Sequence, residues 1–218
     1  SPGKARGVLE FFRESMHFVP PSGSVSPGLD AILDLRGLFR KERSCTVQLR
    51  IQASDGLLVP DPGAFLDAWK ARSQMRITDA VLYDPSIWLL DAGEERLLGC
   101  LWQLQDAGAA LPVQRGLQLT AAALPGVLDA LAGTRVGVRA GGDDVKEYFV
   151  DGDALNCEYR VRDLSGGDLE IGFVLHNGEF HCSSSAISLL PLQPVWAVAG
   201  DRLVRVDTLL ALSMQNAL

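Results

Sequence analysis

Strict alternation of apolar and polar residues is the feature that most restricts what this chain can fold into. Residues 44–51 read Ser-Cys-Thr-Val-Gln-Leu-Arg-Ile, so every second side chain is apolar. Residues 155–162, Leu-Asn-Cys-Glu-Tyr-Arg-Val-Arg, repeat the pattern. Because successive side chains of a β-strand point to opposite faces, both stretches predict half-buried strands. Asp55-Gly56 and the apolar run 57–59 predict the return strand of a hairpin.

Predicted helices lie between the strands in the first 140 residues. An Asp-Pro pair at residues 61–62 predicts a helix over residues 63–72, because Asp is a good N-cap and Pro is tolerated in the first turn. Residues 94–106 predict a second, amphipathic helix whose first glutamates suit its positive N-terminal end. Residues 120–131 predict a third helix, which begins at its first residue or only around Pro125.

The pattern changes after residue 135, where alternation and turn residues predict antiparallel strands. Asn177-Gly178 fits a two-residue hairpin loop, and Gly200-Asp201 separates two further apolar runs. Asp207 predicts the start of a closing helix. We therefore expect an α+β fold, in which an N-terminal mixed strand and helix layer is followed by an antiparallel β meander with a closing helix.

The chain also suggests three successive parts. Residues 1–28 predict an N-terminal arm, with a short helix over residues 5–17, and a linker rich in Pro, Gly and Ser. Residues 29–140 predict an α+β subdomain. Residues 141–218 predict an antiparallel β-rich subdomain that ends in the C-terminal helix.

Charge and cysteine content limit the classes of function and the cellular compartments that fit this chain. Twenty Lys and Arg against 27 Asp and Glu give a net charge of −7, which argues against a protein that coats nucleic acid with its whole surface. No apolar run is long enough to span a bilayer and no signal segment is visible, so we expect no membrane partner. The four cysteines are scattered, which predicts reduced thiols and a cytoplasmic location.

Familiar catalytic patterns are not found in the sequence. Pro2-Gly3-Lys4 lacks the earlier glycine and the following Ser or Thr of a phosphate-binding loop. The patterns G-x-S-x-G, H-E-x-x-H and G-x-G-x-x-G do not occur either. We therefore expect this chain alone to be no enzyme and to need no cofactor.

Four metal-capable side chains gather around the predicted Asn-Gly hairpin. They are Cys157, His176, His181 and Cys182. Their spacing lacks the tight turn that usually supplies two zinc ligands, so we expect the histidines to meet across the hairpin without a metal. A zinc site or a Cys/His nucleophile pair stays open as an alternative. The acidic residues Asp143, Asp144, Asp151 and Asp153 lack calcium-loop spacing and are predicted to be solvated.

A basic stretch is the strongest candidate for a binding site. Residues 34–50 carry five basic and two acidic residues, a local balance of +3. Arginine's planar fork suits phosphate oxygens, so we predict a nucleic-acid contact. The predicted residues are Arg36, Arg40, Lys41 and Arg43. A solvated basic face, or pairs with nearby acids, is the alternative.

Several short runs follow one another between residues 44 and 210. They are Cys45-Thr-Val-Gln-Leu-Arg-Ile, Leu57-Leu-Val, Gly63-Ala-Phe-Leu-Asp-Ala, Ala80-Val-Leu-Tyr-Asp-Pro, the leucine-rich helix from Glu94, Leu117-Gln-Leu-Thr, Leu124-Pro-Gly-Val-Leu-Asp-Ala-Leu and Pro194-Val-Trp-Ala-Val-Ala-Gly-Asp-Arg-Leu-Val-Arg-Val-Asp. Their order resembles the accessory region that precedes the motor of bacterial Swi/Snf-type helicase-like ATPases.

The resemblance implies a non-catalytic domain that positions DNA or regulates the motor. It also implies that the ATP-binding and helicase motifs lie C-terminal to Leu218 in a longer protein, and that a Cys/His zinc element would lie before Ser1. The expected partners are DNA and the motor domain of the same polypeptide or of a partner protein. A protein-docking module without nucleic-acid binding is the alternative.

Overall fold

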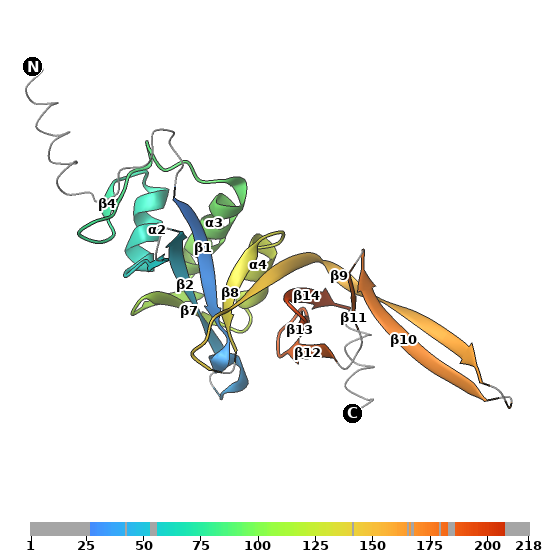
Figure 1. The fold of residues 1–218 in the computed structure, drawn as a ribbon. Coiled ribbons are helices and arrows are strands. Elements are labelled where there is room, and N and C mark those ends of the chain that lie inside the picture. Colours follow the sequence, from blue (N-terminus) through green and yellow to red (C-terminus); the bar gives the residue numbers. More distant parts are fainter. Residues whose placement is uncertain are drawn as a thin grey trace, which may run out of the picture. The chain divides into compact units, whose positions relative to one another are not determined.

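The computed structural model divides into two compact units (Figure 1). The first contains residues 1–31 and 47–118, and the second contains residues 32–46 and 119–218. The structure describes residues 27–41, 43–52, 56–140, 142–164, 166, 168–178, 180–182 and 186–207. The predicted arm, most of the linker and the body of the predicted closing helix lie outside these residues. Strands β1 (Gly28–Asp34) and β2 (Ser44–Gln52) each have one end in each unit.

Strand β2 confirms the alternation that the sequence predicts. Cys45, Val47, Leu49 and Ile51 are all nearly inaccessible to solvent, whereas the residues between them are partly exposed. Strand β3 (Leu57–Leu58) pairs antiparallel with β2, as expected for the predicted hairpin. A second pair of short antiparallel strands, β4 (Met75–Arg76) and β5 (Leu82–Tyr83), also belongs to the first unit.

Two helices of the first unit begin after an aspartate cap, and the sequence predicts only the first of these caps, Asp61. Helix α2 (Pro62–Lys70) begins after Asp61, whose carboxylate accepts a hydrogen bond from the Ala64 amide at 3.0 Å. Helix α3 (Ala92–Asp106) begins two residues before the predicted start, because Asp91 and Glu94 form a reciprocal capping box. The two helices pack against each other. Strands β6 (Ala110–Val113) and β7 (Gly116–Thr120) follow α3.

The second unit contains a mixed sheet, so the predicted antiparallel meander is wrong. Strand β1 pairs parallel with β8 (Arg135–Arg139), and β8 pairs antiparallel with the long β9 (Lys146–Asp163). Strand β14 (Arg202–Val206) lies parallel to β9. Strands β13 (Trp196–Ala199) and β12 (Ile187–Leu190) continue antiparallel from β14. Both parallel pairs join strands that are far apart in sequence, which local patterns do not encode.

Short helical elements complete the described part of this unit. The 3₁₀ helix η1 (Arg36–Phe39) follows β1. Helix α4 (Leu124–Ala130) confirms the later of the two predicted starts, since Thr120 is the last residue of β7 and does not cap the helix. None of the helices in the described part of the chain has the length and apolar character needed to cross a bilayer.

Strand β10 (Leu169–Asn177) pairs with the far half of β9 and forms a two-stranded ribbon (Figure 1). The ribbon register runs from Asp163 opposite Leu169 to Asn156 opposite His176. Strand β11 (Phe180–Cys182) then pairs with the end of β10. The predicted hairpin is therefore present, but its loop begins at Gly178 (φ 56°), because Asn177 still pairs with Phe180.

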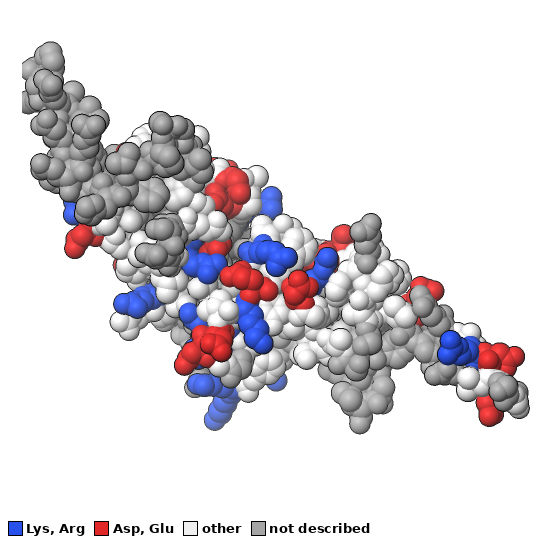
Figure 2. Space-filling model, in the orientation of Figure 1, with Lys and Arg blue, Asp and Glu red and all other residues white. Residues whose placement is uncertain are grey.

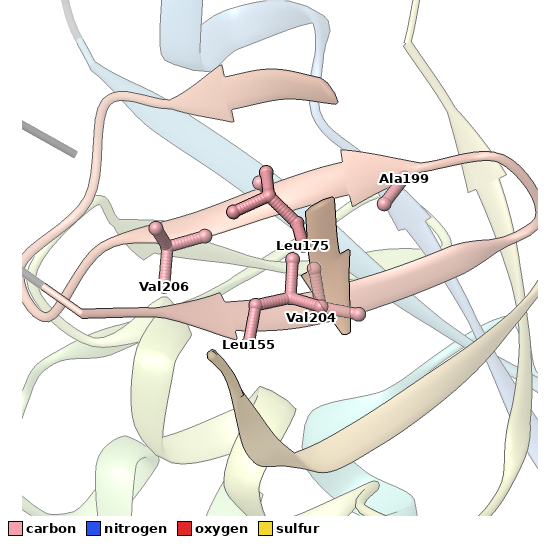
Figure 3. Packing of buried hydrophobic residues seen from close by; sticks show 6 residues of the cluster. Leu155, Leu175, Ala199, Val204 and Val206 are labelled. Carbon is pink, nitrogen blue, oxygen red and sulfur yellow. The ribbon is translucent and has the colours of Figure 1, made fainter. Parts of the chain in front are cut away.

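A cluster of buried apolar side chains holds these strands together (Figure 3). Its members come from β9, β10, β13 and β14 and are Leu155, Leu175, Ala197, Ala199, Val204 and Val206. Figure 3 shows Leu155, Leu175 and Val204 pointing toward one another. Leu175 has no accessible surface, whereas Leu169 on the same strand is 63% exposed.

The substitution Leu175→Ala is expected to lower the free energy of unfolding by about 2–5 kcal/mol, because it leaves a cavity inside this cluster. The matched change Leu169→Ala is expected to alter it by no more than about 0.5 kcal/mol, since that side chain is already in water. Urea unfolding followed by circular dichroism measures both values. Equal losses for the two variants would contradict the assigned register of β10.

Candidate nucleic-acid interface

Element η1 and the loop behind it position the four basic residues that the sequence singles out. Arg36 is the first residue of η1, where Leu38 is buried and anchors the turn. Arg40, Lys41 and Arg43 lie in the loop between η1 and β2, and all three side chains are exposed. We call these three residues the basic loop. Phe39, the last residue of η1, is 62% exposed.

Arg36 pairs with two aspartates instead of standing free. Its Nε donates to Asp34 Oδ1 at 2.9 Å and its Nη2 donates to Asp34 Oδ2 at 2.5 Å. Its Nη1 donates to Asp143 Oδ1 at 2.6 Å. The fork of Arg36 lowers the pKa of Asp34 through these hydrogen bonds, although partial burial acts against them. A phosphate that bound Arg36 would therefore have to compete with two aspartates of the same unit.

The basic loop is held by backbone hydrogen bonds at both ends. The Arg40 amide donates to the Gly37 carbonyl at 3.1 Å, and the Arg43 amide donates to the Arg40 carbonyl at 3.1 Å. The Arg43 carbonyl accepts from the Ala121 amide at 2.9 Å. Arg43 adopts a left-handed backbone with φ 43°, which is uncommon outside glycine. These hydrogen bonds hold the backbone of Arg40 and Arg43.

Several other arginines of the described residues are paired with acidic side chains. On the face in Figure 2, red side chains accompany most of the blue ones. Three further arginines have an aspartate partner within their own unit: Arg50 with Asp30, Arg202 with Asp151 and Arg205 with Asp129. In contrast, no side chain among the described residues pairs with Arg40, Lys41 or Arg43; Glu42 lies outside the described residues.

The predicted solvated acids are only partly free. Asp143 and Asp151 bind Arg36 and Arg202, at 2.6 Å and 2.9 Å respectively. Asp144 and Asp153 are exposed, as predicted. Sequence reasoning missed the pairing of Asp143 because 107 residues separate it from Arg36. The ion pair between Arg36 and Asp34 could have been predicted, because the two residues are only two positions apart in the sequence.

The histidines and cysteines lie on opposite faces of the ribbon. His176 and His181 are directly paired, with ring centroids 5.8 Å apart, so the predicted cross-strand contact is confirmed. Leu175, the neighbour of His176, pairs with Cys157 on one side and Cys182 on the other. Because adjacent strand residues face opposite ways, these histidines and cysteines cannot converge on one metal ion.

Both ribbon cysteines instead pack against the buried cluster, and burial raises the pKa of Cys182. Burial, with a smaller contribution from Asp34, raises the pKa of Cys45 to about 12. The thiols of Cys45 and Cys182 are therefore protonated at neutral pH and are poor nucleophiles. No group of three or more metal-ligating side chains occurs within the described ranges.

Comparison with known proteins gives this geometry no assigned relative. No protein-family model, curated protein or solved structure matches the chain.

The substitution Asp34→Asn is expected to destabilise the fold at neutral pH, because Arg36 loses its bidentate partner. The pKa of Asp34 is lower in the folded chain than its ordinary value of 3.8, so the ionised carboxylate stabilises the fold above that pH. The contribution is lost as pH falls through the lowered pKa. Urea midpoints measured from pH 7 downward should therefore converge for the variant and the original chain.

The control is Asp144→Asn, since Asp144 is exposed and has no side-chain partner among the described residues. Its urea midpoint should follow that of the original chain at every pH. A constant gap between Asp34→Asn and the original chain down to strongly acidic pH would contradict the assigned role of the carboxylate.

Proposed function

We propose that this chain is a non-catalytic accessory region that holds DNA by its phosphates through Arg40, Lys41 and Arg43. One observation carries the proposal: three exposed cations lie close together on a braced loop, and no described acid neutralises them. Arg36 has a different task. Its ion pairs with Asp34 and Asp143 fix η1, and thereby the start of the basic loop.

The charge of the whole chain favours a DNA contact made by a small group of residues over one that involves a large part of the surface. A net charge of −7 repels a polyanion at long range, so any phosphate contact must be made at short range by a concentrated group of cations. Arginine can donate two parallel hydrogen bonds to a phosphate. Because backbone hydrogen bonds hold Arg40 and Arg43, less backbone ordering opposes binding at these two residues, which lowers the entropic cost.

The link to an ATP-driven motor comes from the resemblance to the Swi/Snf-type accessory region. Within that reading, the present chain positions the duplex or restrains the motor, and a separate part of the longer protein hydrolyses ATP. The basic loop is the element through which this chain would touch the duplex.

Replacing Arg40, Lys41 and Arg43 together by Gln is expected to weaken binding to a short DNA duplex. Each phosphate contact contributes about 0.9 to the slope of log affinity against log salt concentration, so the slope should fall by about 2 to 3. Fluorescence anisotropy with a labelled duplex, over a series of salt concentrations, measures both quantities.

A matched triple variant keeps the total charge change the same. Arg76, Arg96 and Arg135 are exposed and unpaired within the described part of the chain, so their joint replacement by Gln is the control. This control should retain the slope and most of the affinity. If both triple variants behave alike, the basic loop only adds solubility.

A second candidate, a protein-docking module, is favoured by the free end of the ribbon. Val161, Leu164 and Leu169 are 64%, 43% and 63% exposed there, which is unusual for three large apolar residues at one end of a hairpin. In this function the ribbon docks on the motor domain, and the basic loop is not used.

The double variant Val161→Glu with Leu169→Glu is expected to abolish binding to a purified motor domain, because it places two charges on the exposed apolar end of the ribbon. The control places Glu at Leu111 and Val113, which are also exposed but lie on β6. Titration calorimetry compares the two. Unchanged binding to the motor in the ribbon variant would remove the docking function.

A further inference from the structure

The first unit contains a cavity that neither the basic loop nor the ribbon explains. Its volume is about 400 Å³, within the range typical of sites that hold one small organic group. The lining combines aromatic, apolar and charged side chains from α2 and the residues just after it, from β5 and the segment that follows, and from α3. These residues are Trp69, Lys70, Arg72, Tyr83, Pro85, Trp88, Leu90 and Glu95.

The aromatic part of the lining is fixed by packing. The Tyr83 and Trp88 rings meet edge to face, with centroids 5.4 Å apart and planes at 89°. Phe65 supports Tyr83 from behind at 5.1 Å. Tyr83 is only 2% exposed, so this wall is rigid, whereas Trp69 is half-buried and offers part of its ring to the cavity. A flat aromatic group can stack on such a surface.

The charged part of the lining has no partner of opposite sign. The side chains of Lys70, Arg72 and Glu95 form no hydrogen bond or ion pair with any described residue. Lys70 also places its ammonium 4.5 Å from the centre of the Trp102 ring, a cation–π contact. Two cations and one carboxylate therefore border the aromatic wall, and a ligand with an anionic group would neutralise the excess positive charge.

Arg72 stands where a helix end favours glycine. Its amide donates to the Trp69 carbonyl at 3.1 Å, and the Ser73 amide donates to the Ala68 carbonyl at 2.9 Å, as at a left-handed helix end. Its φ is 50°, a conformation that a side chain disfavours. A cation near a helix C-terminus gains some electrostatic stabilisation, but an exposed lysine elsewhere in the last turn, Lys70, already supplies it.

We propose that this cavity binds a nucleotide, with the base stacked on Trp69 and the phosphate held by Arg72 and Lys70. Glu95 provides an acceptor at the same rim for an amino group of the base. The ligand is a free nucleotide or an unstacked nucleotide within a single strand. The site is independent of the basic loop, whose expected ligand is the backbone of a duplex.

The test uses the full chain with adenosine monophosphate and with a short single-stranded oligodeoxyadenylate. Binding is followed by quenching of tryptophan fluorescence and by calorimetry. Arg72→Gly is expected to weaken binding roughly tenfold, because one charge-assisted contact is lost. The same change should leave the melting temperature equal or higher, since glycine relaxes the left-handed backbone. Loss of affinity with gain of stability separates a ligand contact from a structural role.

Arg115→Gly is the matched control, because Arg115 is an exposed arginine of the same unit with φ 59° and does not line the cavity. It should keep full affinity. A strand of equal length without bases should bind at least roughly tenfold more weakly, since stacking is lost. Binding of the mononucleotide identifies a free ligand; binding of the base-containing strand alone identifies a single strand.

No binding of either probe overturns the proposal, as does equal binding of the strand without bases. Equal loss of affinity in Arg72→Gly and Arg115→Gly also overturns it. The Gln variant of the basic loop should retain nucleotide binding, and Arg72→Gly should retain duplex binding, so failure of one site is distinguishable from failure of the other.

Discussion

The pairing of β9 with three different strands is the constraint on which the second unit depends. Its first residues, 146–149, pair with β8, residues 149–155 pair with β14, and residues 156–163 pair with β10. A register slip of one residue in any of these pairs would turn the apolar side chains of that part of β9 to the wrong face. The buried position of Leu155, beside Val206 and Leu175, fixes that register where the partners change.

The same alternation decides which side chains can work together. Cys157 and Cys182 flank Leu175 on the core face, and the paired histidines at 176 and 181 occupy the other face. The zinc site that the sequence left open as an alternative would need side chains from both faces of the ribbon, because the pleat places the cysteines and the histidines on opposite faces. The basic loop shows the opposite case, because a tight turn brings exposed cations together without any strand geometry to separate them.

Local signals in the sequence predicted much of the fold, and non-local pairings account for most of what it missed. The alternation in β2, the Asp61 cap and the hairpin at residues 200–201 depend on neighbours in sequence, and all three are present. Local patterns did not predict strand β1, the two parallel pairs or the ion pair of Arg36 with Asp143, because each of them joins segments that are far apart in the sequence. The local excess of basic residues predicted the basic loop, but only the structure shows which of these residues form ion pairs.

Backbone strain gives an independent reason to look at two of the surface sites. Among the described residues other than glycine, those with a left-handed φ are Arg43, Arg72 and Arg115. Glycine or asparagine would meet the backbone requirement at lower energetic cost than arginine. Arg43 ends the basic loop and Arg72 borders the aromatic cavity. Arg115 lies in the turn between β6 and β7, outside both sites, and so measures what strain alone contributes.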